Sequence, residues 1–236
     1  MKILAPLLLT LAVATTRVNA QAPIPWPLGA PVPTTIENNG TAPLSYMFCT
    51  PTVTDAAGQP VTTGLCAFAF LQLPPGETST THWLQTDDFG APVPPGLYFV
   101  NGVPFAIGAA DAALRSLGSP HPGSTRAIEL ASPNDPNAPY IVAAAFSSTN
   151  GFSLGCGVQF PLDNDGLLGA SLSDPAVFQN FFGVLDGTGR SSAPAIALPA
   201  IPELVGFAFD LAFTTLSPAS PCGFVRASVV SHVTVQ

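Results

Sequence analysis

Charged residues are scarce in this 236-residue chain, and basic residues are the scarcest. Asp, Glu, Lys and Arg together make up 8% of the sequence, whereas about 25% is usual for a soluble domain. This composition excludes coiled coils and charged helical bundles, which need many charges on their exposed faces. The formal net charge of −8 provides no basic surface, so we expect no nucleic-acid partner.

The apolar run at the N-terminus is too short for a membrane helix, which needs about 20 apolar residues. It follows Lys2, covers residues 3–13 and is followed by the small-residue site Val18-Asn19-Ala20. This order is typical of a secretory signal peptide. We predict a signal peptide over residues 1–20 and a mature chain that is secreted, periplasmic or on the cell surface, without membrane insertion.

Lysine is absent from the expected mature chain, because cleavage after Ala20 removes Lys2 together with Arg17. Against fourteen acidic residues, the remaining basic residues leave a net charge of −10, and they are Arg115, Arg126, Arg190 and Arg226. A surface of this sign repels nucleic acids and anionic lipids.

Cysteine is present in an even number, which in an exported chain indicates disulfides. The four are Cys49, Cys66, Cys156 and Cys222. No C-x-x-C motif occurs, so zinc binding and thioredoxin-type chemistry have little support. Three pairings are possible. We favour Cys49–Cys66 and Cys156–Cys222, because each pair then stays within one expected domain.

Large apolar residues alternate with a period of two, which is typical of β-strands. The alternation places Phe207, Phe209, Leu211 and Phe213 on one face, and the continuous apolar run at 140–146 suits a strand buried on both faces. Clusters of Gly, Pro, Asn and Asp separate such segments. We predict an all-β fold in which two β-sandwich domains follow each other, over residues 21–105 and 106–236.

Helix signals are confined to two short segments. Residues 111–117 have room for about two turns, and Ser173-Asp174-Pro175 is a capping pattern for a helix that runs to Asn180. We expect neither helix to be a main element of the architecture.

Four motifs of the first half occur in the order found in bacterial immunoglobulin-like domains. They are x-N-x-G-x-x-P-L at 37–44, D-x-x-G-x-x-V at 55–61, P-G-E at 75–77, and a Trp strand, D-D-x-G turn, V-P-P-G and aromatic strand at 83–100. Over residues 31–101 the chain thus resembles the immunoglobulin-like modules of flagellar-hook-cap proteins and secreted-protein tails. It also resembles the BsuPI-type proteinase inhibitors.

That resemblance implies an immunoglobulin-like sandwich over residues 21–105 and a candidate inhibitor loop over residues 50–63. Asp55 and Gly58 in that loop, with Trp83, are the candidate ligand or inhibitor residues. The same residues also have a purely structural interpretation, which we favour for Trp83: its ring would pack against Tyr98 on a neighbouring strand.

The second half resembles the C-terminal regions of uncharacterised secreted bacterial proteins. The similarity rests on residues 182–190, which contain an L-D-x-x-G turn, and on the P-x-L-x-G pattern of residues 202–206. It implies a second β-sandwich and no known activity.

Catalytic and metal-binding motifs are weak. Residues 151–155 match the G-x-S-x-G elbow around Ser153, but the residues that follow cannot begin the helix that this motif requires. His82, His121 and His232 lack metal-ligand spacing. Asp163 and Asp165 offer oxygens for Ca²⁺, yet the other ligand positions of an EF-hand are missing and a capped turn is favoured. We expect no catalytic residues, no metal and no cofactor.

These observations favour an exported, non-catalytic structural or binding module whose partner is a protein or polysaccharide at the cell exterior. The alternative is an extracellular proteinase inhibitor of the BsuPI-like type, which would present residues 50–63.

Overall fold

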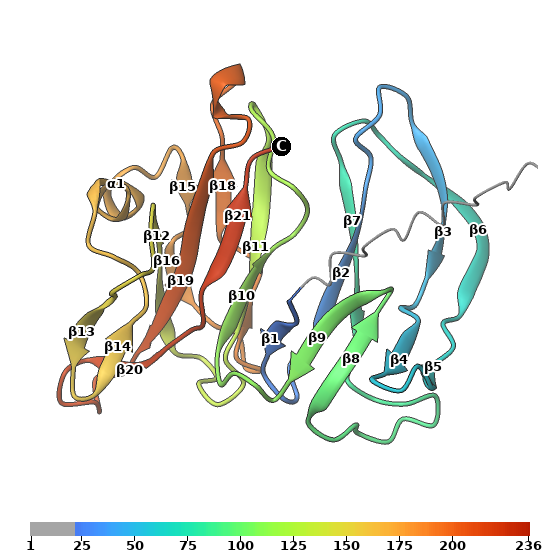
Figure 1. The fold of residues 1–236 in the computed structure, drawn as a ribbon, viewed down its shortest axis with the longest axis horizontal. Helices are drawn as coiled ribbons and strands as arrows, with labels where there is room; N and C mark the ends of the chain where they lie inside the picture. The colour runs from blue at the N-terminus through green and yellow to red at the C-terminus, as the bar shows by residue number, and fades with distance from the viewer. Residues whose placement is uncertain (1–21) are drawn as a thin grey trace, which may run out of the picture.

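The structure is a computed structural model that describes residues 22–236. The predicted signal peptide, residues 1–20, lies outside the described residues. Within residues 22–236 there are 21 strands, one α-helix and one short 3-10 helix (Figure 1). The prediction of an all-β sandwich fold is confirmed. No helix in this part of the chain is long and apolar enough to cross a membrane.

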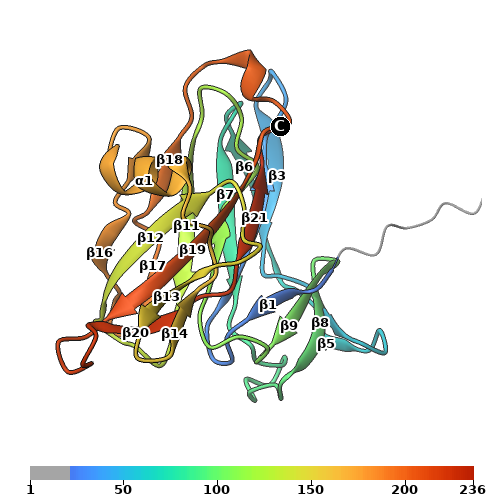
Figure 2. The same ribbon diagram turned by 60° about the vertical axis from the view of Figure 1, so that its left-hand side comes forward.

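The N-terminal half contains one large sheet and two ribbons. The large sheet has the order β1 (Ile24–Trp26), β9 (Val103–Ile107), β8 (Gly96–Val100), β4 (Val53–Asp55) and β5 (Pro60–Thr62). One ribbon pairs β2 (Val32–Glu37) with β7 (Thr78–Trp83), and the other pairs β3 (Leu44–Cys49) with β6 (Cys66–Leu73). The strand β1 is parallel to β9 at the edge of the large sheet (Figure 2).

Aromatic side chains fill the core of this half. Trp26 packs edge-on against Phe105, and the rings of Trp83 and Tyr98 lie 5.3 Å apart, as predicted. The two strands that carry Trp83 and Tyr98 belong to different sheets, however, so residues 84–95 cross between sheets and do not close a hairpin. The sheets are joined here by side-chain packing across the core.

The C-terminal half is a sandwich of two sheets. The first contains β10 (Ala113–Ser116), β11 (Thr125–Ala131), β18 (Ala195–Ala197) and β15 (Phe178–Gln179), with β17 (Arg190–Ser191) also paired to β11. The second contains β16 (Phe182–Val184), β12 (Pro139–Ala145) and β19 (Ala208–Leu216), with β20 (Phe224–Ala227) and β21 (Ser231–Thr234) at opposite ends of β19.

The alternating residues of β19 confirm the predicted strand geometry. Phe209, Leu211 and Phe213 all face the core between the two sheets, where they meet Ile128 and Leu130 of β11. The run predicted as a strand buried on both faces, residues 140–146, is largely buried as β12 up to Ala145, whereas Phe146 lies beyond the strand and is exposed. The outer face of β12 is covered by the helix α1 (Gly166–Ser173) and by the hairpin of β13 (Phe152–Gly155) and β14 (Val158–Phe160) (Figure 1).

Both helix predictions were wrong. Residues 113–116 form β10, because pairing with β11 places Leu114 in the sandwich core and Ala113 in the core of the N-terminal half. The helix α1 ends at Asp174, where the second helix was expected to begin. Its N-cap is Asp165, whose side chain accepts from the backbone N–H groups of Leu167 and Leu168.

Both predicted disulfides, Cys49–Cys66 and Cys156–Cys222, are confirmed. The first joins the paired strands β3 and β6, and the second joins the β13–β14 turn to the loop before β20. The boundary predicted between residues 105 and 106 falls inside β9, whose residues up to Ile107 pair with β8. The division into two independent domains remains a prediction.

Candidate functional site

The two halves meet at the outer face of the β10–β11 pair. Ala113 and Ala131, one on each strand, pack into the hydrophobic core of the N-terminal half. Two residues further along the same face, Arg115 lies directly opposite Glu129 in the strand register. Small apolar and charged side chains thus share one face, which brings ionisable groups into the contact between the halves.

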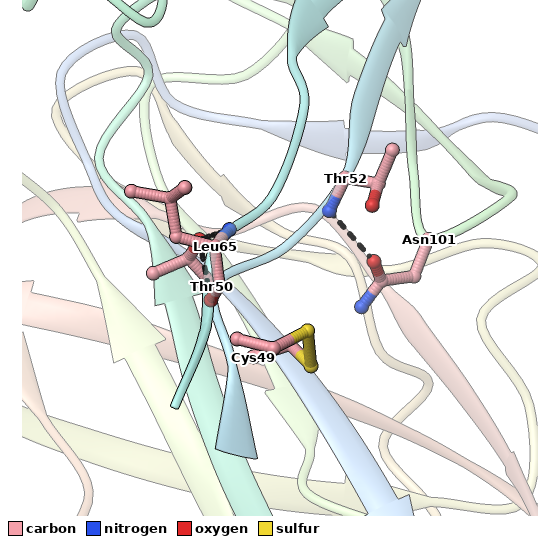
Figure 3. Close-up of a disulfide and its surroundings, with 6 residues drawn as sticks. Cys49, Thr50, Thr52, Leu65 and Asn101 are labelled. Carbon is pink, nitrogen blue, oxygen red and sulfur yellow. Dashed lines mark hydrogen bonds between the residues drawn. A yellow bond between two sulfur atoms is a disulfide. The ribbon is translucent and has the colours of Figure 1, made fainter. Parts of the chain in front are cut away.

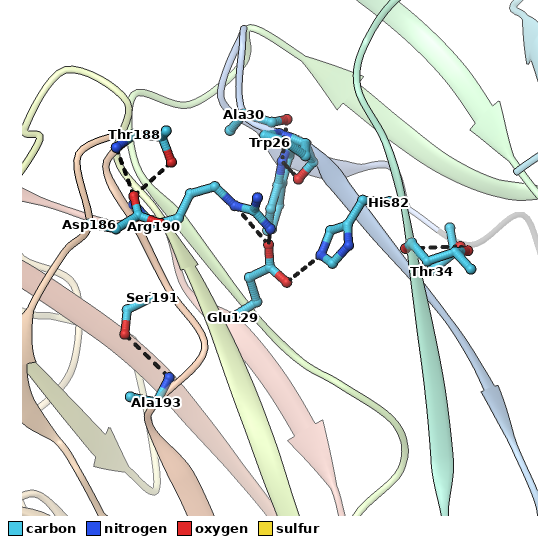
Figure 4. Close-up of polar contacts among 12 residues, drawn as sticks. Trp26, Ala30, Thr34, His82, Glu129, Asp186, Thr188, Arg190, Ser191 and Ala193 are labelled. Carbon is cyan, nitrogen blue, oxygen red and sulfur yellow. Dashed lines mark hydrogen bonds and ion pairs between the residues drawn. The ribbon is translucent and has the colours of Figure 1, made fainter. Parts of the chain in front are cut away.

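Glu129 is the most deeply buried charged residue of this contact, at 1% exposed. One carboxylate oxygen lies 2.8 Å from Nε2 of His82 on β7. The other accepts hydrogen bonds from Nε and a terminal nitrogen of Arg190 on β17 (Figure 4). Two partners from two different strands therefore offset the cost of removing this carboxylate from water.

A second ion pair lies further along the same contact. Arg126 donates to a carboxylate oxygen of Glu37 on β2 at 2.8 Å, and it also donates to the carbonyl oxygens of Gly76 and Ser119. The other oxygen of Glu37 accepts from the backbone N–H of Ser119. Three of these hydrogen bonds, Arg126 to Glu37, Arg126 to Gly76 and Ser119 to Glu37, join the two halves.

Arg115 makes the third polar link. It donates to the carbonyl oxygen of Pro33 at 3.2 Å, and its guanidinium lies 5.1 Å from the centre of the Phe105 ring. Burial lowers the pKa of Arg115. Within residues 22–236 no fully buried side-chain nitrogen or oxygen lacks a hydrogen-bond partner, so this contact is polar but satisfied.

A cleft of about 570 Å³ opens beside this contact and is lined by both halves. Its lining includes Thr35, Arg115, His232 and Thr234. His232 is 77% exposed in its side chain, and its Nδ1 is hydrogen-bonded to Asp210. That bond orients the imidazole and leaves Nε2 without a hydrogen-bond partner among the described residues. A His–Asp pair activates a nucleophile only when a hydroxyl or thiol is hydrogen-bonded to the imidazole, and no hydroxyl of the described residues is hydrogen-bonded to His232.

The β3–β6 ribbon presents several large apolar side chains to solvent. Its two strands contain no charged residue. Phe70 is 74% exposed, and other exposed apolar side chains of the ribbon include Leu44, Met47, Phe48 and Leu71. None of them belongs to a hydrophobic core. Met47 and Phe70 are opposite each other in the strand register and share one face of the ribbon, whereas Leu44 and Leu71 lie on the other face. A patch of neighbouring exposed apolar side chains marks an interaction site in soluble proteins.

The base of this ribbon is held by covalent and hydrogen bonds (Figure 3). Next to the Cys49–Cys66 disulfide, the backbone N–H of Thr50 donates to the carbonyl oxygen of Leu65 at 2.8 Å. Asn101 accepts from the N–H of Thr52 at 2.9 Å, which links the ribbon to the turn between β8 and β9. Since an isolated two-stranded ribbon is marginally stable, these links fix its position.

The three residues predicted for ligand or inhibitor contact have structural roles. Trp83 is 3% exposed, and its indole N–H donates to the carbonyl oxygen of Thr86. Asp55 accepts from the backbone N–H groups of Ala57 and Gln59 and closes the β4–β5 turn, in which Gly58 has a φ of +77°. The candidate inhibitor loop of residues 50–63 therefore consists mainly of the β4–β5 hairpin, and the turn between these strands is its only irregular part within residues 53–62.

Ser153 lies in a β-hairpin. The chain continues from β13 through a turn into β14, whereas a nucleophile elbow requires a helix after the turn. Its Oγ accepts a hydrogen bond from the backbone N–H of Gly155. Ser153 is exposed, but the strand–turn–helix arrangement of a nucleophile elbow is not formed around it.

The carboxylates considered for Ca²⁺ are occupied by backbone donors. Asp163 accepts from the N–H groups of Thr149, Asn150 and Gly151. The hydrogen bond from the Ser147 side chain, together with these backbone bonds, lowers the pKa of Asp163 to about 2. Asp165 caps α1. In the described chain no group of three or more His, Cys, Asp or Glu side chains is arranged to hold a metal ion.

The sequence did not reveal the Glu129 cluster or the exposure of the ribbon. The only local signal was a glutamate between Ile128 and Leu130 in an apolar strand. Its partner His82 lies 47 residues earlier and in another sheet. The alternation of apolar residues along a single strand does not show which distant residue will contact Glu129.

Neither a scan against protein-family models nor a search of curated proteins finds a match to this chain. The function is therefore argued from its own residues. The resemblance to immunoglobulin-like modules remains a prediction.

Proposed function

We propose that this protein is an exported, non-catalytic binding module whose first half is an immunoglobulin-like sandwich. The observation that carries the proposal is the β3–β6 ribbon, an uncharged surface with large apolar side chains that no core covers. In this proposal the ribbon is the contact surface, and the partner is a protein at the cell exterior.

The ribbon suits a protein partner for two physical reasons. Its strands carry no charge, so covering them requires no desolvation of ionised groups. Within the described residues β3 and β6 pair only with each other, so each has an edge at which a partner strand can be added. Apolar pockets between side chains such as Met47 and Phe70 would then provide specificity.

Export is supported by the predicted signal peptide and by the two disulfides, because disulfides persist in oxidising compartments. The expected mature chain has no lysine, and all four of its arginines are engaged in hydrogen bonds, which fits a partner that is not an anionic polymer. A secreted, periplasmic or surface-bound location is part of the proposal.

The test compares wild type with Phe70→Ser in co-sedimentation with a cell-envelope fraction. The matched control is Phe89→Ser, since Phe89 is 95% exposed but lies outside the ribbon. We expect wild type and the control to bind equally and Phe70→Ser to bind at least tenfold less, with circular dichroism verifying that all three are folded.

Equal binding by Phe70→Ser and wild type would remove the ribbon from the proposal. Binding that survives protease treatment of the envelope would assign the partner to polysaccharide. Turnover of a hydrolase substrate that is lost on a point substitution would contradict the non-catalytic role.

The second candidate is proteinase inhibition, favoured by the turn between β4 and β5. Its backbone is held by the hydrogen bonds of Asp55 and it lies near the Cys49–Cys66 disulfide in the chain, and a rigid turn loses little entropy on binding. Titration against a panel of serine proteinases tests it. Inhibition that Asp55→Ala weakens would support this candidate, and no inhibition by wild type would eliminate it.

A further inference from the structure

A separate groove lies on the outer face of the second sheet of the sandwich. Its volume is about 300 Å³. The floor is formed by Ile141 and Ala143 of β12 together with Thr214 of β19, and the walls come from α1 and the β13–β14 hairpin. The elements that line the groove, α1 and the β13–β14 hairpin, lie at the opposite end of the molecule from the β3–β6 ribbon (Figure 1).

The groove exists because small residues on the sheet face large residues on its walls. Ala143 contributes only a methyl group to the floor, whereas Phe152, Leu154 and Leu172 stand along the sides. Leu172 is partly exposed, so apolar surface remains in contact with water. Filling this surface with an apolar group is favourable.

Both ends of the hairpin wall are fixed independently of what the groove contains. At one end the Cys156–Cys222 disulfide joins the hairpin turn to the loop before β20. At the other end Asp163 accepts from the backbone N–H groups of Asn150 and Gly151. The groove is therefore preformed, which reduces the entropy cost of binding.

The helix wall is fixed as well. Asp165 accepts from the N–H of Phe146 and caps the helix, and Oγ of Ser171 accepts from the N–H of Ala144 on β12. These bonds hold α1 against the sheet without closing the space between them.

The lining of the groove favours an uncharged ligand. None of its residues is ionisable, and eight of the ten are apolar. Of the two polar ones, Thr214 already donates to the carbonyl oxygen of Arg226, whereas the exposed amide of Asn164 has no hydrogen-bond partner among the described residues. The flanking carboxylates of Asp163 and Asp165 oppose an anionic ligand at this end.

We propose that the groove binds one uncharged aliphatic chain with a small polar end, such as a long-chain alcohol or a neutral monoacyl lipid. The chain lies against Ile141, Phe152 and Leu154, and the amide of Asn164 hydrogen-bonds the polar end. A volume near 300 Å³ is at the lower limit for ligand pockets, which suits one chain and not two.

The experiment measures displacement of the neutral fluorescent probe N-phenyl-1-naphthylamine by 1-alkanols from hexanol to decanol. Each added methylene is expected to tighten binding roughly threefold to fourfold until the groove is full. The alkanoate of the same length is expected to bind at least tenfold more weakly than the alkanol, because its carboxylate approaches Asp163 and Asp165.

Two variants locate the binding. Leu172→Glu places a charge at the groove edge, and Leu154→Trp fills the groove without adding charge. Each is expected to weaken probe binding at least tenfold. The matched control is Leu84→Glu, the same substitution at a residue that is 64% exposed in the N-terminal half, and it is expected to bind like wild type.

Melting curves establish that the variants are folded. The proposal is overturned if wild type does not bind the probe, if affinity is independent of chain length, or if a folded Leu154→Trp binds like wild type. Because the ribbon is at the other end of the molecule, envelope binding is expected to be unchanged in all of these variants, so the two proposals fail separately.

Discussion

Single ionisable residues have a large effect in a protein with so few of them. Each of the four arginines of the described chain is bonded to a carboxylate or to a backbone carbonyl. Arg226, for example, contacts both Asp111 and Asp135. These side chains join segments that are distant in sequence.

The clearest residue-scale prediction concerns Glu129. Glu129→Ala removes the carboxylate that pairs with Arg190 and His82, and it leaves the Arg190 guanidinium without its buried partner. We expect a loss of about 3 kcal/mol in the free energy of unfolding, as is usual when one member of a buried pair is removed. Urea denaturation measures it.

The control for this substitution is Glu203→Ala, because Glu203 is exposed. It is expected to change the free energy of unfolding by less than about 0.5 kcal/mol. A similar effect of both substitutions would show that the buried pair has no special role in stability.

Asp163 makes stability depend on pH in the acid range. Its pKa is about 2 in the folded protein against an ordinary value of 3.8, chiefly because of the hydrogen bonds from Ser147, Asn150 and Gly151. Since the folded pKa is the lower one, the stabilisation is complete above about pH 5 and is lost as the pH falls from about 4 toward 2.

We therefore expect the melting temperature of wild type to exceed that of Asp163→Asn at pH 6, and the difference to shrink as the pH is lowered to 2. Thermal melts across this pH range provide the measurement. A difference that stays constant with pH would mean that ionisation of Asp163 does not contribute.

At the scale of elements, the strand β1 is short but essential to the N-terminal core. It begins at Ile24, pairs in parallel with β9, and places Trp26 in full burial with its indole N–H donating to the carbonyl oxygens of Ala30 and Pro31. The core of this half is therefore completed by a segment close to the predicted cleavage site after Ala20.

Trp26→Ala tests this element. Loss of a fully buried Trp is expected to lower the free energy of unfolding by about 3–5 kcal/mol, measured by urea denaturation. Leu28→Ala, at an exposed position two residues later, is the control and is expected to have little effect. Equal small effects would mean that β1 is dispensable.

Elements with a strong period-two pattern were predicted correctly, and elements decided by long-range contacts were not. The alternation at 207–213 exists in the sequence and needs no partner to be recognised. Residues 111–117 have no such pattern, and they form β10 because β11 lies beside them and two cores cover their two faces. Tertiary pairing overrides a weak local preference of this kind.

At the scale of the whole molecule, the distribution of arginine predicts resistance to trypsin. All four arginines of residues 22–236 lie within strands, at Arg115, Arg126, Arg190 and Arg226. A protease needs an extended, unpaired segment, so cleavage requires local unfolding. We expect the native protein to resist trypsin within this range and the reduced, denatured protein to be cut after all four, as monitored by mass spectrometry.

Chymotrypsin is the matched control for this prediction. Phe89 is largely exposed in the segment that crosses between the sheets, and we expect chymotrypsin to cut the native protein there first. Rapid tryptic cleavage of the native protein after any of the four arginines would contradict the expected protection.

The sequence by itself determined the all-β class and the acidic, lysine-free composition of the expected mature chain, and it favoured the correct one of three possible cysteine pairings. These properties follow from local periodicity, from residue counts and from the distances along the chain. Only the tertiary structure decided that Glu129 meets His82 and Arg190, that the β3–β6 ribbon stays uncovered, and that a groove remains beneath α1. Each of these depends on which strands lie side by side, and strand pairing between distant segments leaves no trace in the local pattern.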